Sequence, residues 1–157
     1  MNLLDTVATN TFTISDLKRR VRVLKEYLEK KIFGGNLKIE LVSQDSLWLN
    51  SLTNIGTVVD TKNFYQQMAD LAKAVSALSP LIIYLAFDPP DEVISKLALD
   101  LRKILNSNLI FLDIKKDPGL LGGSAFVYKG IYKDYSLRAK LEQNKEKILL
   151  EIKRGIA

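Results

Sequence analysis

Seven consecutive apolar residues, Leu81 to Phe87, constrain the fold of this chain more than any other feature. The run is far shorter than the ~20 residues that a membrane-spanning helix needs. Its continuous apolar character is typical of a strand buried on both faces. Asp88-Pro89-Pro90-Asp91-Glu92 follows at once and predicts a helix start, with a capping carboxylate, prolines with preset φ and acids in the first turn. The buried face of that helix is predicted to consist of Val93, Ile94, Leu97, Leu101, Ile104 and Leu105.

The rest of the second half alternates between strands and helices. Residues 109–114 predict another strand, and two short strands, 124–129 and 131–133, flank Gly130 as a hairpin. A last helix is expected from Ser136 to about Arg154, and its inward face is predicted to be Leu137, Leu141, Ile148 and Ile152. The order strand, helix, strand, hairpin, helix predicts an α+β chain with a small mixed β-sheet.

The first half is predicted to be mainly helical. One helix is expected to start at the N-cap Ser15 and to stop at Gly34-Gly35, and another to run from Thr61 to Pro80. Residues 37–42 predict a short strand between them, and residues 46–52 fit no clear period. We expect a helical region over 1–79 and an α/β domain over 80–157. The apolar stripes of the two helices are predicted to be Leu17, Val21, Leu24, Leu28 and Ile32, and Phe64, Met68, Leu71, Ala72 and Val75.

The first of these helices carries seven basic residues against three acidic ones. One interpretation is a solvated face beside a stripe that packs on the chain's own core. The other is that the near-heptad stripe, with its basic flanks, receives an acidic or amphipathic helix of another subunit. The seven residues are Lys18, Arg19, Arg20, Arg22, Lys25, Lys30 and Lys31.

Composition removes most enzyme classes. The 157 residues include no histidine and no cysteine, so Ser-His triads, cysteine nucleophiles and thiolate zinc sites are excluded. The net charge of +5 is compatible with nucleic acid, an anionic membrane surface or an acidic protein. The N-terminus shows no basic leader before an apolar stretch, so we expect no signal peptide and a cytoplasmic protein, or one held at a membrane by other subunits.

The most distinctive stretch is Asp117-Pro118-Gly119-Leu120-Leu121-Gly122-Gly123, followed by Asp134, Ser136, Leu137, Arg138, Lys140 and Leu141. Together these residues resemble the C-terminal signature of the delta subunit of F-type ATP synthases, called OSCP in mitochondria. That family shows Asp-Pro-x-Leu-Leu/Ile-Gly-Gly, a hairpin, and then Asp-x-Ser-Val/Leu-Arg-x-Arg/Lys-Leu at the start of the final helix. The similarity spans residues 81–152, and Gly130 lies one position later than the family's usual turn glycine.

The resemblance implies a non-catalytic stator subunit without cofactors. Its implied partners are the alpha subunits of the catalytic head and the b-type subunits of the peripheral stalk, and its implied location is the cytoplasmic face of the membrane, as part of the complex. The family's six-helix N-terminal bundle looks shortened or replaced here, because about eighty residues precede Leu81. The binding role of that bundle is therefore not assigned to any residue of this chain.

Read from the residues alone, the same motif has structural roles. Asp117-Pro118 predicts a turn, and Gly122-Gly123 predicts a close backbone approach or a positive φ rather than a phosphate loop, since no Gly-Lys-Ser/Thr follows. Ser136 is predicted to be an N-cap rather than a nucleophile, and Asp134 to assist it. A cation site of Asp113, Asp117 and Asp134 is disfavoured by the neighbouring Lys115, Lys116 and Lys133.

Two functions rival the stator. Tyr128, Tyr132 and Tyr135 lie beside lysines, and Tyr128 and Tyr132 are expected on one sheet face, which would suit a small basic nucleic-acid-binding module. A carboxylate-dependent enzyme lacks a residue set with the required partners. For the stator, Leu141, Ile148 and Ile152 are expected in the core, and Leu149 and Leu150 either meet a partner helix or fold onto the first half. The predicted partner-binding residues are Leu149, Leu150 and Ile156, with Arg138, Lys145 and Lys153 as a basic rim.

Overall fold

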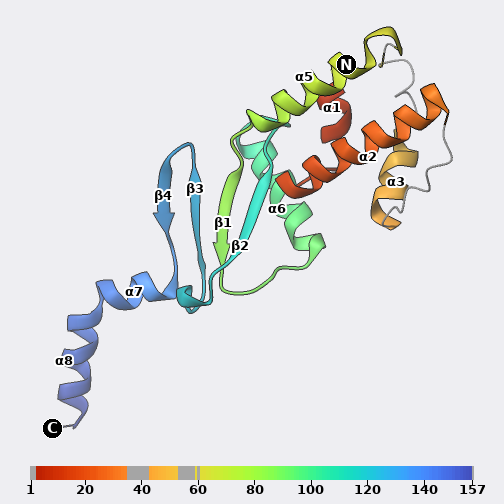
Figure 1. The fold of residues 1–157 in the computed structure, drawn as a ribbon. Coiled ribbons are helices and arrows are strands. Elements are labelled where there is room, and N and C mark those ends of the chain that lie inside the picture. Colours follow the sequence, from red (N-terminus) through yellow and green to blue (C-terminus); the bar gives the residue numbers. More distant parts are fainter. Residues whose placement is uncertain (1–2, 35–42, 53–58, 60, 157) are drawn as a thin grey trace.

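In the computed structural model, which describes residues 3–34, 43–52, 59 and 61–156, the chain is α+β, as predicted (Figure 1). The described part of the first half is helical and the second half holds one four-stranded sheet. The helices are α1 (Leu3–Ala8), α2 (Ile14–Phe33), α3 (Ser43–Ser51), α5 (Phe64–Ser76), α6 (Asp91–Ile104), α7 (Leu137–Gln143) and α8 (Lys145–Ile156). Two 3-10 turns, η1 (Thr61–Asn63) and η2 (Pro118–Leu120), precede α5 and the hairpin. The strands are β1 (Leu81–Leu85), β2 (Leu112–Lys116), β3 (Ser124–Tyr128) and β4 (Ile131–Asp134).

The sheet has the order β2-β1-β3-β4. β1 pairs parallel with β2 through the α6 crossover and antiparallel with β3, so Ile83 lies opposite both Ile114 and Phe126. β3 and β4 form the predicted hairpin. The turn residues Lys129 and Gly130 have φ values of 48° and 80°, and two positive φ values are what a two-residue turn of the favoured type requires.

Two apolar cores hold the fold together. The larger one joins α1, α2, α3 and α5, and its buried members include Leu17, Leu24, Trp48 and Phe64. The smaller core packs α6 on β1 and β2, through Ala98, Leu81 and Leu112. The cores adjoin, because Phe111 belongs to the first and precedes β2 directly.

Backbone pairing and one arginine connect the first half to the sheet. Thr13 forms a parallel bridge with Leu112, whose amide donates to the carbonyl of Phe12 at 2.9 Å. From α6, the half-buried Arg102 donates to the carbonyl oxygens of Thr11 and Ile110. Burial lowers the pKa of this guanidinium.

Several predicted boundaries and faces are wrong. Thr13, not Ser15, caps α2, since its hydroxyl accepts the amide hydrogen of Asp16 at 3.1 Å. Pro90 occupies the cap position of α6, while Asp88 pairs with Lys116 at 2.7 Å. β1 ends at Leu85 and is fully buried at Leu81 and Ile83 alone, because α6 covers only one face of the sheet. β2 begins three residues later than expected, because Ile110 and Phe111 are buried before it and Phe111 belongs to the core of the helical half.

Some helix faces also differ from their predicted patterns. On α6 the buried side is centred on Ala98. Val93 and Ile104 are exposed because they lie more than about 100° around the helix from Ala98. Leu105 is exposed because it follows the last residue of the helix, as its C-cap. Ala72 of α5 is exposed as well. The ambiguous segment 46–52 falls almost entirely in α3. The strand predicted over 37–42 lies outside the described residues.

Candidate functional site

The Asp-Pro motif forms a self-contained turn between β2 and β3. Asp117 caps η2, since its carboxylate accepts the amide hydrogen of Gly119 at 2.9 Å, as the turn prediction requires. Leu120 is buried beneath the turn, and Leu121 takes a left-handed φ of 62° that leaves its side chain exposed. Arg138 lies over the turn, since a Cβ added to Gly119 would be 3.6 Å from its Nη1.

Gly123 is where the motif touches the start of the final helix. Its φ is 75°, and a Cβ there would lie 2.6 Å from the carbonyl oxygen of Tyr135. A Cβ on Gly122 would meet only Leu137 Cβ, at an ordinary 3.8 Å, but the Gly122 carbonyl accepts the amide hydrogen of Leu137 at 2.9 Å. The close backbone approach predicted for the pair is therefore found at Gly123. The glycines lead into β3, not into a helix, so they do not form the strand-to-helix loop that holds phosphate.

The helix entry is built by Asp134 and Ser136. The buried Ser136 hydroxyl accepts the amide hydrogen of Ala139 at 3.1 Å, which confirms the predicted N-cap. The Asp134 carboxylate accepts the Ser136 amide hydrogen at 2.8 Å and a hydrogen bond from the Tyr132 hydroxyl at 3.1 Å. Hydrogen bonding from the side chain and then the backbone of Ser136 lowers the pKa of Asp134. The side chains of Asp134 and Ser136 are thus engaged in hydrogen bonds that hold the start of the helix.

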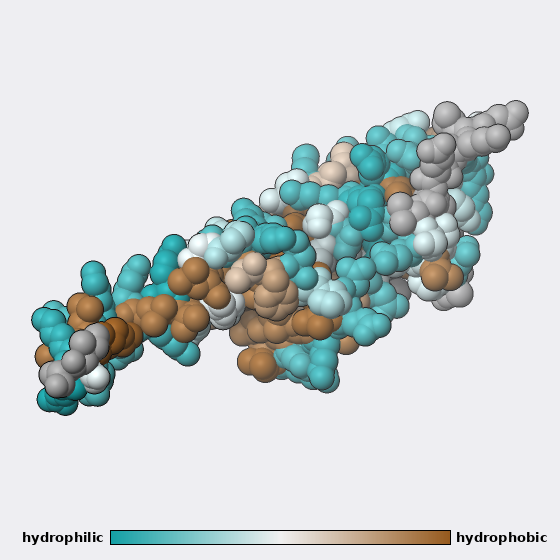
Figure 2. Space-filling model, turned by 90° about the horizontal axis from the view of Figure 1, so that it is seen from below, coloured by the Kyte–Doolittle hydropathy of each residue, from teal (hydrophilic) through white to brown (hydrophobic). Residues whose placement is uncertain are grey.

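The final helix differs most from its prediction. It breaks at Asn144 into α7 and α8, and the two helices extend away from the sheet as an arm (Figure 1). Leu137, Leu141, Ile148 and Ile152 were expected in the core. All four are exposed, between 37% and 49%, because the arm extends away from the body, where the turn at η2 lies against the start of α7. Figure 2 shows apolar residues along this arm and onto the middle of the body.

Those predicted partner-binding residues of the arm whose side chains the structure describes are also exposed. Leu149 is 47% and Leu150 56% exposed, and neither folds back onto the described part of the first half. The side chain of Ile156 lies outside the described part of the chain. The basic rim predicted from Arg138, Lys145 and Lys153 is exposed along the arm.

One apolar stripe runs along α8. Successive side chains of an α-helix point in directions about 100° apart. Ile148, Leu149 and Ile152 therefore lie within an arc of about 100°, while Leu150 points to the opposite side from Ile148. Leu137 and Leu141, four residues apart, share one face of α7. We call Ile148, Leu149 and Ile152 the α8 stripe.

Half of one sheet face is also uncovered. Strands lie about 4.8 Å apart and a helix is about 10 Å across, so one helix covers about two strands. On this face α6 lies over β1 and β2, and Phe126 and Tyr128 of β3 are partly buried at its edge. Ile131 and Tyr135 are exposed beside them, with Tyr135 stacked on Phe126 at 5.9 Å. This half-face has room for one more helix.

The hairpin register separates two of the tyrosines. Tyr128 lies opposite Ile131 and Tyr132 lies opposite Val127. Opposed residues point to the same face and successive residues alternate, so Tyr128 and Tyr132 lie on opposite faces. The expectation that they share a face is wrong. The two-residue turn pairs Tyr128 with Ile131, so Ile131, and not Tyr132, lies on the face of Tyr128.

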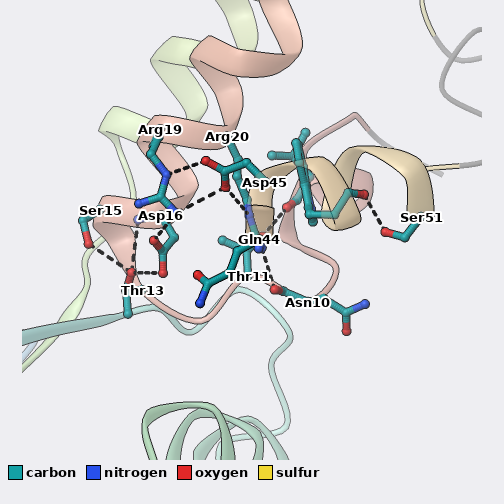
Figure 3. A network of polar contacts seen from close by, with 12 residues as sticks. Asn10, Thr11, Thr13, Ser15, Asp16, Arg19, Arg20, Gln44, Asp45 and Ser51 are labelled. Atoms are coloured by element: carbon teal, nitrogen blue, oxygen red, sulfur yellow. Dashed lines mark hydrogen bonds and ion pairs between the residues drawn. The ribbon is translucent and has the colours of Figure 1, made fainter. Parts of the chain in front are cut away.

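Sequence reasoning missed a buried ion cluster between α2 and α3 (Figure 3). Asp45 is 1% exposed and accepts two hydrogen bonds from Arg19, at 2.8 and 3.2 Å. Arg20 Nε lies 3.5 Å from the same carboxylate, and Arg20 Nη1 donates to the Asn10 carbonyl and the Thr11 hydroxyl at 2.6 and 2.7 Å. Burial lowers the pKa of Arg20, whereas the hydrogen bond to Asp45 raises that of Arg19.

One signal in the sequence could have identified Arg20. It lies three residues after Leu17 and four before Leu24, so it occupies the buried stripe of α2 rather than its solvated face. Its guanidinium also stacks 5.0 Å from the centre of the Trp48 ring. Nothing local marks Asp45, because its burial depends on how α3 packs against α2.

Arg19 and Arg20 of this cluster form the floor of a cleft of about 660 Å³ between α2, α3 and the start of α6. Its walls include Phe12, Leu47, Trp48 and Ile94. Asp91 and Glu92 lie on the α6 side, where Gln44 donates to Asp91 at 3.2 Å.

The described residues contain no group of three or more acidic side chains arranged to hold a metal ion. Asp113, Asp117 and Asp134 are separately engaged with Lys115, Gly119 and Ser136. None of the helices described here is both long and apolar enough to cross a membrane. Comparisons of the chain with protein-family models and with curated proteins found no match.

Proposed function

We propose that this chain is a non-catalytic stator subunit of an F-type ATP synthase, joining the catalytic head to the peripheral stalk. The observation that carries the proposal is the α7–α8 arm, whose described leucine and isoleucine side chains, from Leu137 to Ile152, are exposed. A helix that retains an apolar stripe away from its own core is suited to a second helix. The resemblance of residues 81–152 to the delta subunit supplies the identity of that partner.

The partner at the arm would be a helix of the b-type stalk subunits. The α8 stripe and the uncovered half-face at Ile131 and Tyr135 offer it apolar contacts, and Lys145 and Lys153 lie where they could pair with acidic residues at the edges. The alpha subunits of the head are the other proposed partners. Assembly would place the chain at the cytoplasmic face of the membrane, through the complex alone.

The Asp-Pro-Gly motif has a structural role in this proposal. Asp117, Gly123, Asp134 and Ser136 fix where the arm leaves the sheet, through the turn, the close approach to Tyr135 and the helix cap. A subunit that resists torque needs this rigid exit and no reacting group. The hairpin register leaves the rival nucleic-acid module one tyrosine fewer on a single face, since Tyr132 lies on the opposite face from Tyr128.

Two neighbouring leucines give a matched test. Leu149→Ser and Leu150→Ser remove the same side chain from the same exposed helix, but only Leu149 lies in the α8 stripe. Burying a leucine at an interface contributes about 1.5–3 kcal/mol. Leu149→Ser should therefore weaken binding to a purified b-type stalk fragment roughly tenfold or more, and Leu150→Ser should leave it almost unchanged.

Calorimetric titration measures the two affinities, and unchanged melting temperatures show that both variants fold. Equal affinities for the two variants would refute the stripe as the contact surface. No detectable binding of the unaltered chain to the stalk fragment would refute the stalk partner itself.

A further inference from the structure

The cleft between α2, α3 and α6 has the features of a docking site for a basic amphipathic helix. Its floor is fixed, because Arg19 and Arg20 already hold Asp45 and present no free cation to a ligand. Leu47 stands 73% exposed on the wall, beside the partly buried Ile94. A ligand that fits therefore needs apolar side chains.

The charge of the cleft favours a cationic occupant. Three carboxylates line the cleft, those of Asp16, Asp91 and Glu92, against the guanidinium groups of Arg19 and Arg20, so the net charge of its lining is −1. The buried Asp45 adds a further negative charge behind the two arginines. Asp16 and Asp45 are paired with Arg19. Asp91 and Glu92 are exposed, and no lysine or arginine of the described residues pairs with either. Complementary charge across an interface selects partners and speeds their encounter.

One described segment of this chain has the matching chemistry. α8 carries four basic residues (Lys145, Lys147, Lys153 and Arg154) and two acidic ones (Glu146 and Glu151), a net charge of +2. It also carries the uncovered α8 stripe. The arm and the α2–α3 helices lie at opposite ends of the molecule (Figure 1), so α8 does not reach the cleft of its own chain.

We infer that the cleft receives α8 of a second copy of this chain. The exchange would be reciprocal, since each copy offers one cleft and one arm, as a two-fold dimer requires. The stripe would lie against Leu47 and Ile94, and the basic residues of α8 would face Asp91 and Glu92. α8 cannot hold a stalk helix on the same stripe at the same time, so this contact belongs to the free subunit. The inference does not depend on the proposed function.

Trp48 provides the readout, because it is the one tryptophan of the sequence and it lines the cleft. The receiver is the full chain with Ile148→Ser and Ile152→Ser, which cannot dock its own arm. The probe is a synthetic peptide of residues 137–157, which contains no tryptophan. We expect a saturable change in Trp48 emission, and roughly tenfold weaker binding when salt rises from about 0.05 to 0.5 M.

Charge exchange tests the orientation of the contact. Asp91→Lys with Glu92→Lys in the receiver should weaken peptide binding roughly tenfold, and Lys153→Glu with Arg154→Glu in the peptide should restore it. Asp70→Lys with Asp100→Lys, the same charge change outside the cleft, is the matched control. Leu47→Ser is a second variant with little effect on folding, since Leu47 is exposed, and it should also weaken binding.

The unaltered chain should also form a dimer in sedimentation equilibrium, and the Ile148→Ser, Ile152→Ser chain should be a monomer. The inference is overturned if the unaltered chain stays monomeric. It is equally overturned if peptide up to roughly millimolar concentration leaves Trp48 emission unchanged. The same holds if neither Leu47→Ser nor the charge exchange changes the affinity of the peptide. All of these measurements use the purified chain without alpha or b-type subunits, so their failure leaves the proposed function standing.

Discussion

Gly123→Ala should destabilise the chain much more than Gly130→Ala. Both glycines have a positive φ, 75° and 80°, which costs an alanine about 1–2 kcal/mol. A Cβ at Gly130 would meet nothing within 4 Å, whereas one at Gly123 would lie 2.6 Å from the Tyr135 carbonyl oxygen. Relief of that clash must shift the start of the arm.

The shift threatens two hydrogen bonds of 2.9 Å, from the Tyr135 amide to the Ser124 carbonyl and from the Leu137 amide to the Gly122 carbonyl. Each contributes about 0.5–1.5 kcal/mol. We therefore expect a loss of about 2–5 kcal/mol for Gly123→Ala and about 1–2 kcal/mol for Gly130→Ala. A chain of this size loses about 2–4 °C of melting temperature per kcal/mol.

Thermal and urea unfolding, followed by circular dichroism, measure both variants. The difference between them isolates the contact with Tyr135, because the φ contribution is common to both. Equal melting temperatures would refute the close approach as the reason for the glycine.

Three further perturbations test the contacts described above. Ser136→Ala should lower the free energy of unfolding by about 1 kcal/mol through loss of the N-cap and leave stalk binding intact; lost binding at unchanged stability would refute the cap. Asp45→Ala should cost about 3–5 kcal/mol in urea unfolding, since it leaves Arg20 buried without its carboxylate. Asp16→Ala, at a partly exposed ion pair, should cost at most about 1 kcal/mol. The folded-state pKa of Asp134 lies below the ordinary value of 3.8. The ionised Asp134 therefore contributes fully to the free energy of unfolding above pH 3.8, and this contribution is lost as the pH falls through the folded-state pKa. Asp134→Asn should therefore reduce the dependence of the free energy of unfolding on pH below about 3.8, measured by urea unfolding at a series of pH values.

The parts predicted correctly from the sequence are those fixed by local chemistry. The turn at Asp117, the Ser136 cap, the hairpin around Gly130 and the C-cap at Gly34 each depend on a side chain or a φ within a few residues. The α+β class follows from the order of such elements.

The wrong predictions concern contacts between distant segments. Periodicity marked Ile148 and Ile152 as apolar stripe residues, but it could not show that the arm leaves the body after a break at Asn144. The burial of Arg20 requires Asp45, 25 positions away in the sequence, and therefore the packing of α3. The sheet faces on which Tyr128 and Tyr132 lie depend on which two residues form the hairpin turn.

The most direct test of the stator proposal is purification of the chain from its native cells through an affinity tag, with quantification of the proteins that accompany it. The account predicts alpha and b-type subunits in fixed ratio to the tagged chain, recovered in a membrane-bound complex that hydrolyses ATP. The Leu149→Ser chain should lose the b-type subunits, and the Leu150→Ser chain should retain them. Recovery of the tagged chain free of ATP synthase subunits, or bound to nucleic acid in a salt-sensitive manner, would contradict the account.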